Sequence, residues 1–304
     1  QPSTSTTNNS HLHISPATAT INIDNNKLQI IATPPSMLPS FLCTRSIVLL
    51  AVASAFQPTN LIHRSSSISR LVSSKNLSHL KMTKGPFPEL VVFDLDACFW
   101  DQEMYTLSKI PDESNIVTGD LNGRGEGVVG VMSGRSRISL HKGSLLALQS
   151  HHDKKYPNTK VCFASSADTP QAERIGRAAL KLLEVVPGTT VWDLVVGRDW
   201  DGEDVNQIGR QPPLSANKSA THFPILRELT RVRYDRMLFF DDCQWGDHCG
   251  QVERACKERE TGNGPVTIRT PFGLGAEEWA EGLNKYAKKF QALDGSDNYD
   301  IKKR

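Results

Sequence analysis

The stretch Leu90-Val91-Val92-Phe93-Asp94-Leu95-Asp96-Ala97-Cys98-Phe99-Trp100 joins a continuous apolar run to two acids spaced one residue apart. An uninterrupted apolar run is typical of a strand buried on both faces, as in a parallel sheet covered by helices. Open sheets of this kind bind ligands at the carboxyl ends of their strands. Buried carboxylates are costly unless they bind a cation or take part in chemistry. Asp94 and Asp96 are therefore candidate functional residues, although a polar turn after a strand is the simpler alternative.

Apolar segments farther along the chain predict that strands and helices alternate. We expect strands at about 90–95, 160–164, 190–196, 236–240 and 266–268, and helices at 141–152, 168–184, 219–231 and 276–293. This alternation predicts an α/β fold with a Rossmann-like, mostly parallel sheet and helices on both faces. A Gly-rich stretch within 99–140 predicts a small flap insert over the end of the first strand. Residues 197–217 are expected to form a polar loop.

The front of the chain differs in composition from the rest and predicts a disordered leader. The chain begins at Gln1 and its first methionine is Met37, after which a short apolar run ends in small residues, as in a signal peptide. The next segment has no acids, as is typical of a transit peptide. We divide the chain into a non-native upstream segment (1–36), a signal peptide (37–55), a transit-peptide-like leader (56–84), a folded domain (88–294) and a polar tail (295–304). Plastid delivery is expected, or a cytoplasmic protein if translation starts at Met82.

Charge and cysteine content exclude several classes of protein. Residues 1–88 carry seven of the 35 basic residues and one of the 33 acidic ones, which leaves 28 basic and 32 acidic residues in 89–304. No basic stripe for nucleic acid is present in this mildly acidic part. The apolar run near Leu49 is too short to span a bilayer. Five cysteines beyond the leader, without a CxxC pair, argue against a zinc site and a disulfide framework. The sequence leaves the oligomeric state open.

Polar residues follow three of the predicted strands, and a lysine follows the polar loop. They are Asp94 and Asp96, Ser165 and Ser166, Asp241 and Asp242, and Lys218. Because the carboxyl ends of parallel strands share one edge of a sheet, we expect these side chains to meet there. Clustered carboxylates repel each other unless a hard cation with oxygen ligands lies between them, and Mg²⁺ suits carboxylates plus a substrate phosphate. Acids, metal, hydroxyl and lysine together predict phosphoryl transfer.

These motifs, in this order, resemble those of the haloacid dehalogenase (HAD) superfamily. Asp94-Leu95-Asp96-Ala97-Cys98 is similar to its D-x-D-x-[TV] motif. Further residues narrow the resemblance to the magnesium-dependent phosphatase-1 family. They are Trp100, Ala164-Ser165, the Thr-His-Phe that follows Lys218, and Phe239-Phe240-Asp241-Asp242. The resemblance covers roughly 88–270 and implies a HAD-type phosphatase domain. Two positions depart from the pattern: Cys98 stands where Thr is usual, and Ser166 where the narrower family tends to have Arg.

The resemblance implies a mechanism and a role for each residue. Asp94 is the nucleophile and forms an aspartyl-phosphate. Asp96 protonates the leaving oxygen and later deprotonates the attacking water. The Mg²⁺ cofactor is held by Asp94, the backbone carbonyl of Asp96 and Asp241, with Asp242 close by. Ser165 or Ser166 binds the phosphoryl oxygens, and Lys218 neutralises the nucleophile and the phosphate.

The expected function is hydrolysis of a phosphomonoester, on a small molecule or a phosphoprotein. Phosphotyrosine-like and sugar-phosphate substrates both agree with the resemblance, and the sequence does not choose between them. A phosphotransferase with the same nucleophile and a non-catalytic HAD-fold binding protein are the alternatives. Cys98 and Cys243 each follow a pair of acids, and we hypothesise that their oxidation would inhibit the enzyme, although two inert small side chains are the simpler interpretation.

Overall fold

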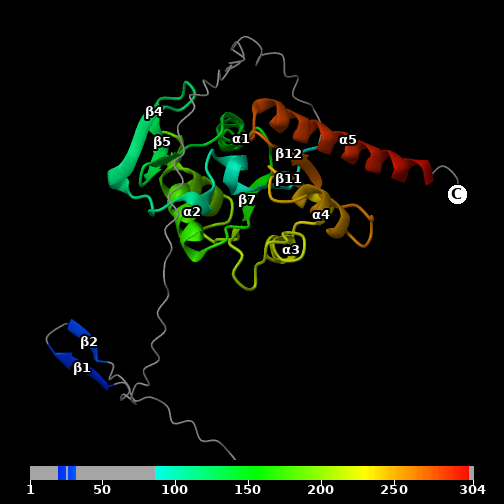
Figure 1. The fold of residues 1–304 in the computed structure, drawn as a ribbon. Coiled ribbons are helices and arrows are strands. Elements are labelled where there is room, and N and C mark those ends of the chain that lie inside the picture. Colours follow the sequence, from blue (N-terminus) through cyan, green and yellow to red (C-terminus); the bar gives the residue numbers. More distant parts are fainter. Residues whose placement is uncertain (1–19, 25–26, 32–85, 301–304) are drawn as a thin grey trace, which may run out of the picture. The chain divides into compact units, whose positions relative to one another are not determined.

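The computed structural model describes residues 20–24, 27–31 and 86–300, and the side chains of 86–291 (Figure 1). In the upstream segment, β1 (Thr20–Asp24) and β2 (Lys27–Ile31) form an antiparallel hairpin, which the sequence did not predict. The signal-peptide and transit-peptide-like segments lie outside the described residues, so plastid delivery stays a prediction. Within the described residues, no helix has the length and apolar character needed to cross a bilayer.

Five parallel strands form the central sheet of the folded domain. Their order is β10-β7-β3-β11-β12, with β3 (Leu90–Phe93) in the middle. The others are β7 (Lys160–Ser165), β10 (Gln207–Ile208), β11 (Met237–Asp241) and β12 (Val266–Arg269). All four residues of β3 are buried, as its continuous apolar sequence predicts. The predicted α/β fold with a mostly parallel sheet is therefore confirmed.

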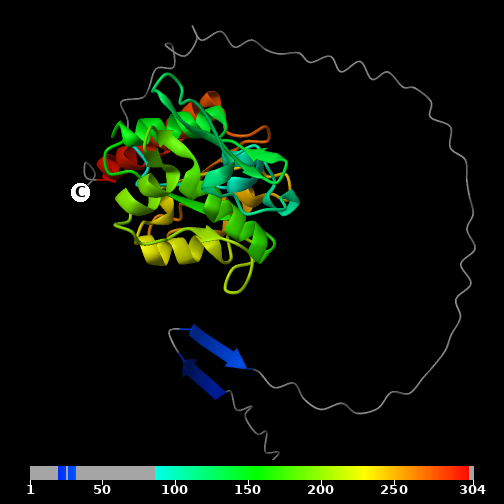
Figure 2. The same ribbon diagram turned by 90° about the vertical axis from the view of Figure 1, so that its left-hand side faces the viewer.

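Alternate side chains of the central strands pack into two separate cores. Val91 and Phe93 face a core that includes α1 (Lys142–His152), α2 (Pro170–Leu182) and α5 (Ala276–Asp300). Leu90 and Val92 face the other core, with α3 (His222–Thr230) and α4 (His248–Ala255). Figures 1 and 2 show α1 and α5 on one side of the sheet and α3 on the other. Because helices cover both faces of the sheet, a ligand can reach it only at an edge, such as the one formed by the carboxyl ends of the strands.

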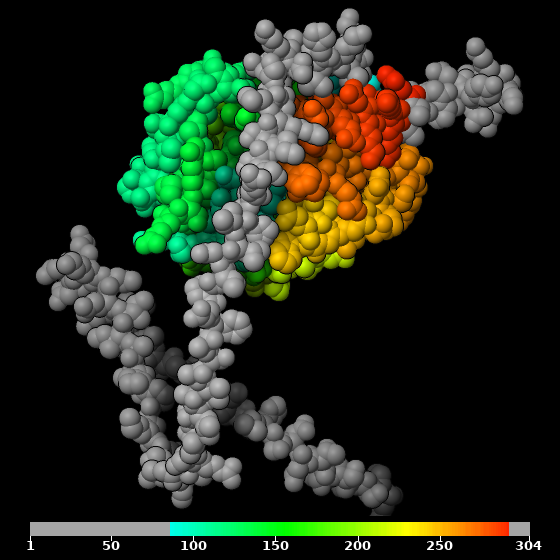
Figure 3. All heavy atoms as spheres, turned by 45° about the horizontal axis from the view of Figure 1, so that its top comes forward, coloured from blue at the N-terminus to red at the C-terminus, as the bar shows by residue number. Residues whose placement is uncertain are grey.

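The predicted flap insert is present as a three-stranded antiparallel sheet. It consists of β4 (Ile116–Asp120), β5 (Glu126–Ser133) and β6 (Ser136–Ile138). The Val128 N–H donates to the carboxylate of Glu184, just after α2, at 2.9 Å. In Figure 3 this sheet and α5 lie on opposite sides of the folded domain. The sheet is thus anchored beside α2. The prediction that the flap covers the end of β3 is wrong for these three strands.

Other differences from the prediction concern short or polar segments. The expected strand at 190–196 is wrong: a short hairpin of β8 (Glu184–Val186) and β9 (Thr189–Thr190) precedes an irregular helical turn at Asp193–Arg198. Thr190 and Asp193 cause this turn, because each side chain accepts the backbone N–H of the other, as in a capping box. The predicted loop 197–217 contains β10, and α4 was missed. Helix α5 continues to Asp300, beyond the predicted end at 293, and no proline interrupts it.

Candidate active site

Asp94 lies directly after β3, where the backbone leaves the sheet in an irregular turn over Leu95–Phe99. Its N–H donates to the Phe240 carbonyl of β11 at 2.9 Å, which extends the strand pairing by one residue. Asp96 is extended, and Ala97 has a left-handed conformation (φ 51°). This change of direction separates the two acids: Asp94 stays at the strand end, while Asp96 projects from the turn. Spacing of two residues therefore gives two carboxylates with different surroundings.

The carboxylate of Asp96 is held by two donors from its own segment. The Trp100 indole N–H donates to Oδ1 at 3.2 Å, and the Met104 backbone N–H donates to Oδ2 at 3.1 Å. Burial nevertheless raises the pKa of Asp96 to about 7, because the two hydrogen bonds offset only part of the desolvation. A carboxyl group of this kind can hold a proton near neutral pH and release it, which suits a general acid and base.

Lys218 connects the acids of two neighbouring strands. Its ammonium lies 2.7 Å from Asp94 Oδ1 and 2.7 Å from Asp241 Oδ2, and its side chain is 1% exposed. The side-chain oxygen of Asn217 accepts the backbone N–H of Ser219, an Asx turn that fixes the backbone on either side of the lysine. Although burial opposes it, the charges of Asp241 and Asp94 raise the pKa of Lys218 above its usual value. Lys218 is thus a permanent cation inside the site.

Asp241 and Asp242 end β11 and lie beside Asp94. Asp241 is fully buried, and its other contacts are with the Cys243 N–H at 2.8 Å and with His248 Nδ1 at 3.3 Å. Burial would raise the pKa of Asp241, but Lys218 and His248 together hold it below its usual range. Asp242 accepts the Gln244 N–H at 3.1 Å, and burial followed by the charge of Asp241 raises its pKa.

Three carboxylates therefore share a single lysine. Burial, opposed by Lys218 and reinforced by Asp241 and Asp242, raises the pKa of Asp94. One oxygen from each of the three acids can be chosen so that all lie within 4.8 Å of one another, a separation that one bound ion can bridge. The donor set is oxygen only, which fits a hard divalent cation such as Mg²⁺. The surplus negative charge of the three acids over Lys218 gives such a cation a stabilising role.

Ser165 ends β7 and is held on both sides by neighbouring loops. Its carbonyl accepts the Gly209 N–H at 2.8 Å and the His222 Nε2–H at 3.1 Å. His222 is fully buried, and burial, with the nearby Lys218, lowers its pKa to about 4. A neutral His222 therefore supports the serine loop and has a structural role. The hydroxyl of Ser166 lies 3.5 Å from the Ala216 carbonyl.

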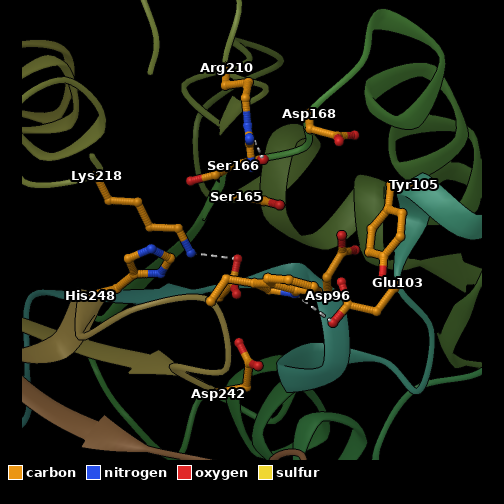
Figure 4. A pocket seen from close by; sticks show the side chains of 12 residues that line it. Asp96, Glu103, Tyr105, Ser165, Ser166, Asp168, Arg210, Lys218, Asp242 and His248 are labelled. Carbon is orange, nitrogen blue, oxygen red and sulfur yellow. Dashed lines mark hydrogen bonds and ion pairs between the residues drawn. The ribbon is translucent and has the colours of Figure 1, made fainter. Parts of the chain in front are cut away.

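A cavity of about 240 Å³ opens over these residues (Figure 4). Its walls bring together most of the predicted site: Asp94, Asp96, Ser165, Ser166, Lys218 and Asp242. Asp241 lies beneath the cavity, where it holds Lys218. The strands of the flap contribute nothing to these walls, and the insert is represented instead by Glu103 and Tyr105. Both serines line the cavity, so either can contact a phosphoryl group.

Sequence reasoning missed several residues of this cavity. They are Glu103, Tyr105, Asp168, Arg210, Trp245 and His248. His248 begins α4, and Asp247 caps that helix by accepting the Gly250 N–H at 2.8 Å. An Asp before a short run of polar and apolar residues is a helix-start signal, and it could have located His248. Asp168 lies just before α2, at the start of a helix that was predicted without a site role. The remaining four lie in loops or a short helical turn and carry no periodic pattern.

Two cysteines lie behind the acids. Cys98 is fully buried and accepts a hydrogen bond from the Thr270 hydroxyl at 3.2 Å, and burial raises its pKa. Cys243 is partly exposed, and a hydrogen bond with Cys249 lowers its pKa. All five cysteines in the described part of the chain are free thiols. This agrees with the sequence, which argued against a disulfide framework. The redox role of Cys98 and Cys243 stays a hypothesis.

Comparison with known proteins gives one result for the whole domain. A search of curated proteins found no match to this chain. The model of the acid phosphatase family matches residues 86–289, which include the central sheet and every residue of the cavity. This match agrees with a phosphatase and with hydrolysis of a phosphoric monoester. The chain belongs to the acid phosphatase family.

Proposed function

We propose that the protein is a Mg²⁺-dependent phosphomonoester phosphatase that acts through an aspartyl-phosphate on Asp94. The observation that carries this proposal is the position of Asp94 at the end of β3, 2.7 Å from the buried ammonium of Lys218 and beside two further acids. A carboxylate at the floor of a cavity, in contact with a fixed cation and beside oxygen donors for a divalent ion, is suited to attack phosphorus once these cations balance its charge.

The two halves of the reaction use the same two acids. Asp94 attacks phosphorus, the bond to the ester oxygen breaks, and Asp96 gives its proton to that oxygen. Asp96 then takes a proton from water, which attacks phosphorus and breaks the bond to Asp94, so that inorganic phosphate leaves. The raised pKa of Asp96, about 7, supports this double role. Lys218 offsets charge that accumulates on the carboxylate and the phosphoryl group.

The proposed Mg²⁺ would be held by Asp94 and Asp241, with the carbonyl of Asp96 and the carboxylate of Asp242 as further oxygen donors. When bound, it neutralises negative charge on the phosphoryl oxygens. The chain's own residues then have to position the ester: the Ser165–Ser166 loop faces the acids from across the cavity, as Figure 4 shows. Either serine hydroxyl can donate to a phosphoryl oxygen.

The rim of the cavity favours aryl phosphates over sugar phosphates as substrates. Tyr105 and Trp245 meet there in a T-shaped contact with ring centroids 6.0 Å apart, and the Trp245 indole N–H donates to Glu103 at 3.3 Å. Trp245 is 71% exposed and lines the cavity, so the face of its ring is accessible to a ligand there. Such a pair can stack against the ring of a phosphotyrosine-like ester.

The test is turnover of p-nitrophenyl phosphate by the full chain in Mg²⁺ and in EDTA. We expect turnover with Mg²⁺, its loss in EDTA, and its recovery when Mg²⁺ is added back. Asp120→Asn, on β4 and away from the cavity, is the matched control for Asp94→Asn and should retain activity. Turnover that is equal in EDTA would contradict the metal requirement.

Two measurements separate the alternatives. A phosphotransferase would form a new ester when alcohols are supplied as acceptors, whereas a hydrolase releases only inorganic phosphate. A non-catalytic binding protein would show no turnover of any ester. The covalent step is tested by acid quenching during turnover and detection of phosphate on the peptide that contains Asp94. No label on this peptide under single-turnover conditions would contradict the aspartyl-phosphate.

A further inference from the structure

One cation of the cavity has no part in the reaction described so far. Five carboxylates line the cavity: Asp94, Asp96, Glu103, Asp168 and Asp242. The lining cations are Lys218, Arg210 and, when protonated, His248. Lys218 and His248 are both engaged by Asp241. Arg210 forms no ion pair with a carboxylate in the described part of the chain, although acids outnumber bases around it.

The backbone next to Arg210 holds this residue against the serine loop. Gly209 donates its N–H to the Ser165 carbonyl at 2.8 Å, and its own carbonyl accepts the His222 Nε2–H at 3.1 Å. The φ of Gly209 is 133°, a conformation that L side chains rarely adopt, so glycine permits this close pairing. The backbone of Arg210 therefore follows Gly209, whose two hydrogen bonds hold it against the serine loop.

The side chain of Arg210 is also oriented. Its Nε–H donates to the Ser166 carbonyl at 3.1 Å, which leaves both terminal nitrogens of the guanidinium for other partners. Figure 4 shows Ser166 and Ser165 between Arg210 and the acids Asp96 and Asp242. A phosphoryl group seated among the acids would thus have the serine loop between itself and Arg210. The guanidinium would then be placed to contact a part of the substrate other than that phosphoryl group.

We infer that Arg210 binds a second acidic group of the substrate, a carboxylate or a phosphate, and so selects phosphomonoesters that carry one. This inference rests on the proposed function and deepens it. Two free guanidinium nitrogens match the two oxygens of such a group in a bidentate contact. In Figure 4, Asp168 lies on the other side of Ser166 and repels an acidic group there, so that only the side of Arg210 favours one.

The experiment compares three aryl esters that keep the same ring for the aromatic rim. They are phenyl phosphate, 3-carboxyphenyl phosphate and 1,3-phenylene bisphosphate, each measured with the full chain in Mg²⁺. We expect Arg210→Gln to lower the kcat/KM of an acidic ester, relative to that of phenyl phosphate, by about tenfold or more, as for loss of a charge-assisted bidentate contact. This decrease in kcat/KM should come mainly from a higher KM. Arg210→Lys, a point charge, should retain part of the preference.

Arg135→Gln is the matched control, because Arg135 is an exposed arginine of the flap that does not line the cavity. It should leave the preference for acidic esters at the wild-type value. Thermal unfolding of each variant checks that the fold is retained. A loss confined to 3-carboxyphenyl phosphate or to 1,3-phenylene bisphosphate supports the inference and tells which acidic group is bound.

Three outcomes would overturn the inference. A wild-type enzyme that does not prefer acidic esters lacks the selectivity. Proportional loss on all three esters in Arg210→Gln would mean that Arg210 contacts the phosphoryl group itself. An unchanged preference in Arg210→Gln would mean that Arg210 is not the determinant. In each of these cases phosphatase activity persists, so the proposed function survives; only a wild type that hydrolyses none of the esters removes both.

Discussion

Buried acids lie at both ends of strand β11, but only those at one end are each paired with a cation of their own. At the end where the strand begins, Arg233 forms two bonds to Asp235 (2.7 and 3.1 Å). Glu258 reaches the same end, where it accepts the Tyr234 N–H and two bonds from Arg227 (2.8 and 2.9 Å). After the strand, three acids share one lysine. Each acid at the first end has an arginine of its own, and the second end has an excess of negative charge.

This contrast indicates which charges serve the fold and which serve chemistry. A buried carboxylate that has its own arginine is neutralised in the folded chain and needs no further ligand. Carboxylates that outnumber their cations destabilise the fold unless a metal or substrate completes the site. The strand begins with apolar residues and ends in Asp241, and different segments bring cations to its two ends. Helix α3 and the residues just before β11 supply the arginines, whereas the loop before α3 supplies Lys218.

The largest effect expected at the second end is the loss of activity in Asp94→Asn. An amide cannot form the acyl phosphate, so kcat should fall by about a thousandfold or more. The free energy of unfolding without metal should change by less than about 1 kcal/mol, because lost attraction to Lys218 is offset by reduced repulsion among the acids. Turnover assays and urea unfolding measure the two quantities. Major destabilisation would show that this acid also holds the fold together.

Asp96→Asn should give the next largest effect and change the pH profile. The acid form of Asp96 is present below its pKa of about 7 and falls as the pH rises above it, so wild-type attack on phenyl phosphate should slow in that range. The variant should lose about 10²-fold or more in kcat, together with this alkaline limb. The loss should be smaller with p-nitrophenyl phosphate, whose leaving group needs less protonation. Equal losses with both esters would contradict a general acid at this position.

Glu258→Gln tests the compensated end and should affect stability without loss of activity. Because Arg227 is partly exposed, we expect a cost of about 1–2 kcal/mol in unfolding free energy. The hydrogen bonds from Arg227 lower the pKa of Glu258 from 4.5 to about 2. The ion pair of Glu258 therefore makes its full contribution to the free energy of unfolding above pH 4.5, and this contribution is lost as the pH falls toward 2. The stability gap between wild type and variant should close in that window; a constant gap would argue against the ion pair.

The smallest effect is expected for Asp242→Asn, and its sign should depend on metal. Burial and the charge of Asp241 raise the pKa of Asp242, so its ionised form destabilises the metal-free fold at neutral pH. In EDTA the variant should unfold at the same or a slightly higher temperature than the wild type. Added Mg²⁺ should stabilise the wild type more than the variant. A wild type that Mg²⁺ does not stabilise would break the contrast between the two ends.

The sequence predicted the parts of the site that strands position. Asp94, Ser165 and Asp241 follow apolar runs, and the geometry of a parallel sheet brings the ends of such runs together. Lys218 lies in a loop, and it became a candidate because the polar loop meets the next helix there; the resemblance then implied its role. The sheet and most helices were predicted for the same reason: long apolar patterns determine them.

The remainder depends on contacts between distant loops, which have no periodicity to detect. The pairing of Tyr105 with Trp245 joins the flap insert to the loop after β11, and neither segment predicts the other. Strand β10 has two residues, too few for an alternating pattern. The flap was predicted as an element, but its position over the end of β3 was wrong. The contacts that hold it join residues far apart in the sequence, such as Val128 with Glu184 and Leu121 with Gln149.

The position of the flap beside α2 has a consequence for the kinetics. Because its strands do not line the cavity, no rearrangement of that sheet has to precede the entry of an ester or the departure of phosphate. The rim that substrates meet is made of Tyr105 and Trp245, both largely in contact with solvent. If the proposed phosphatase activity is correct, we therefore expect turnover not to be limited by movement of the flap and to be insensitive to added viscogens such as sucrose.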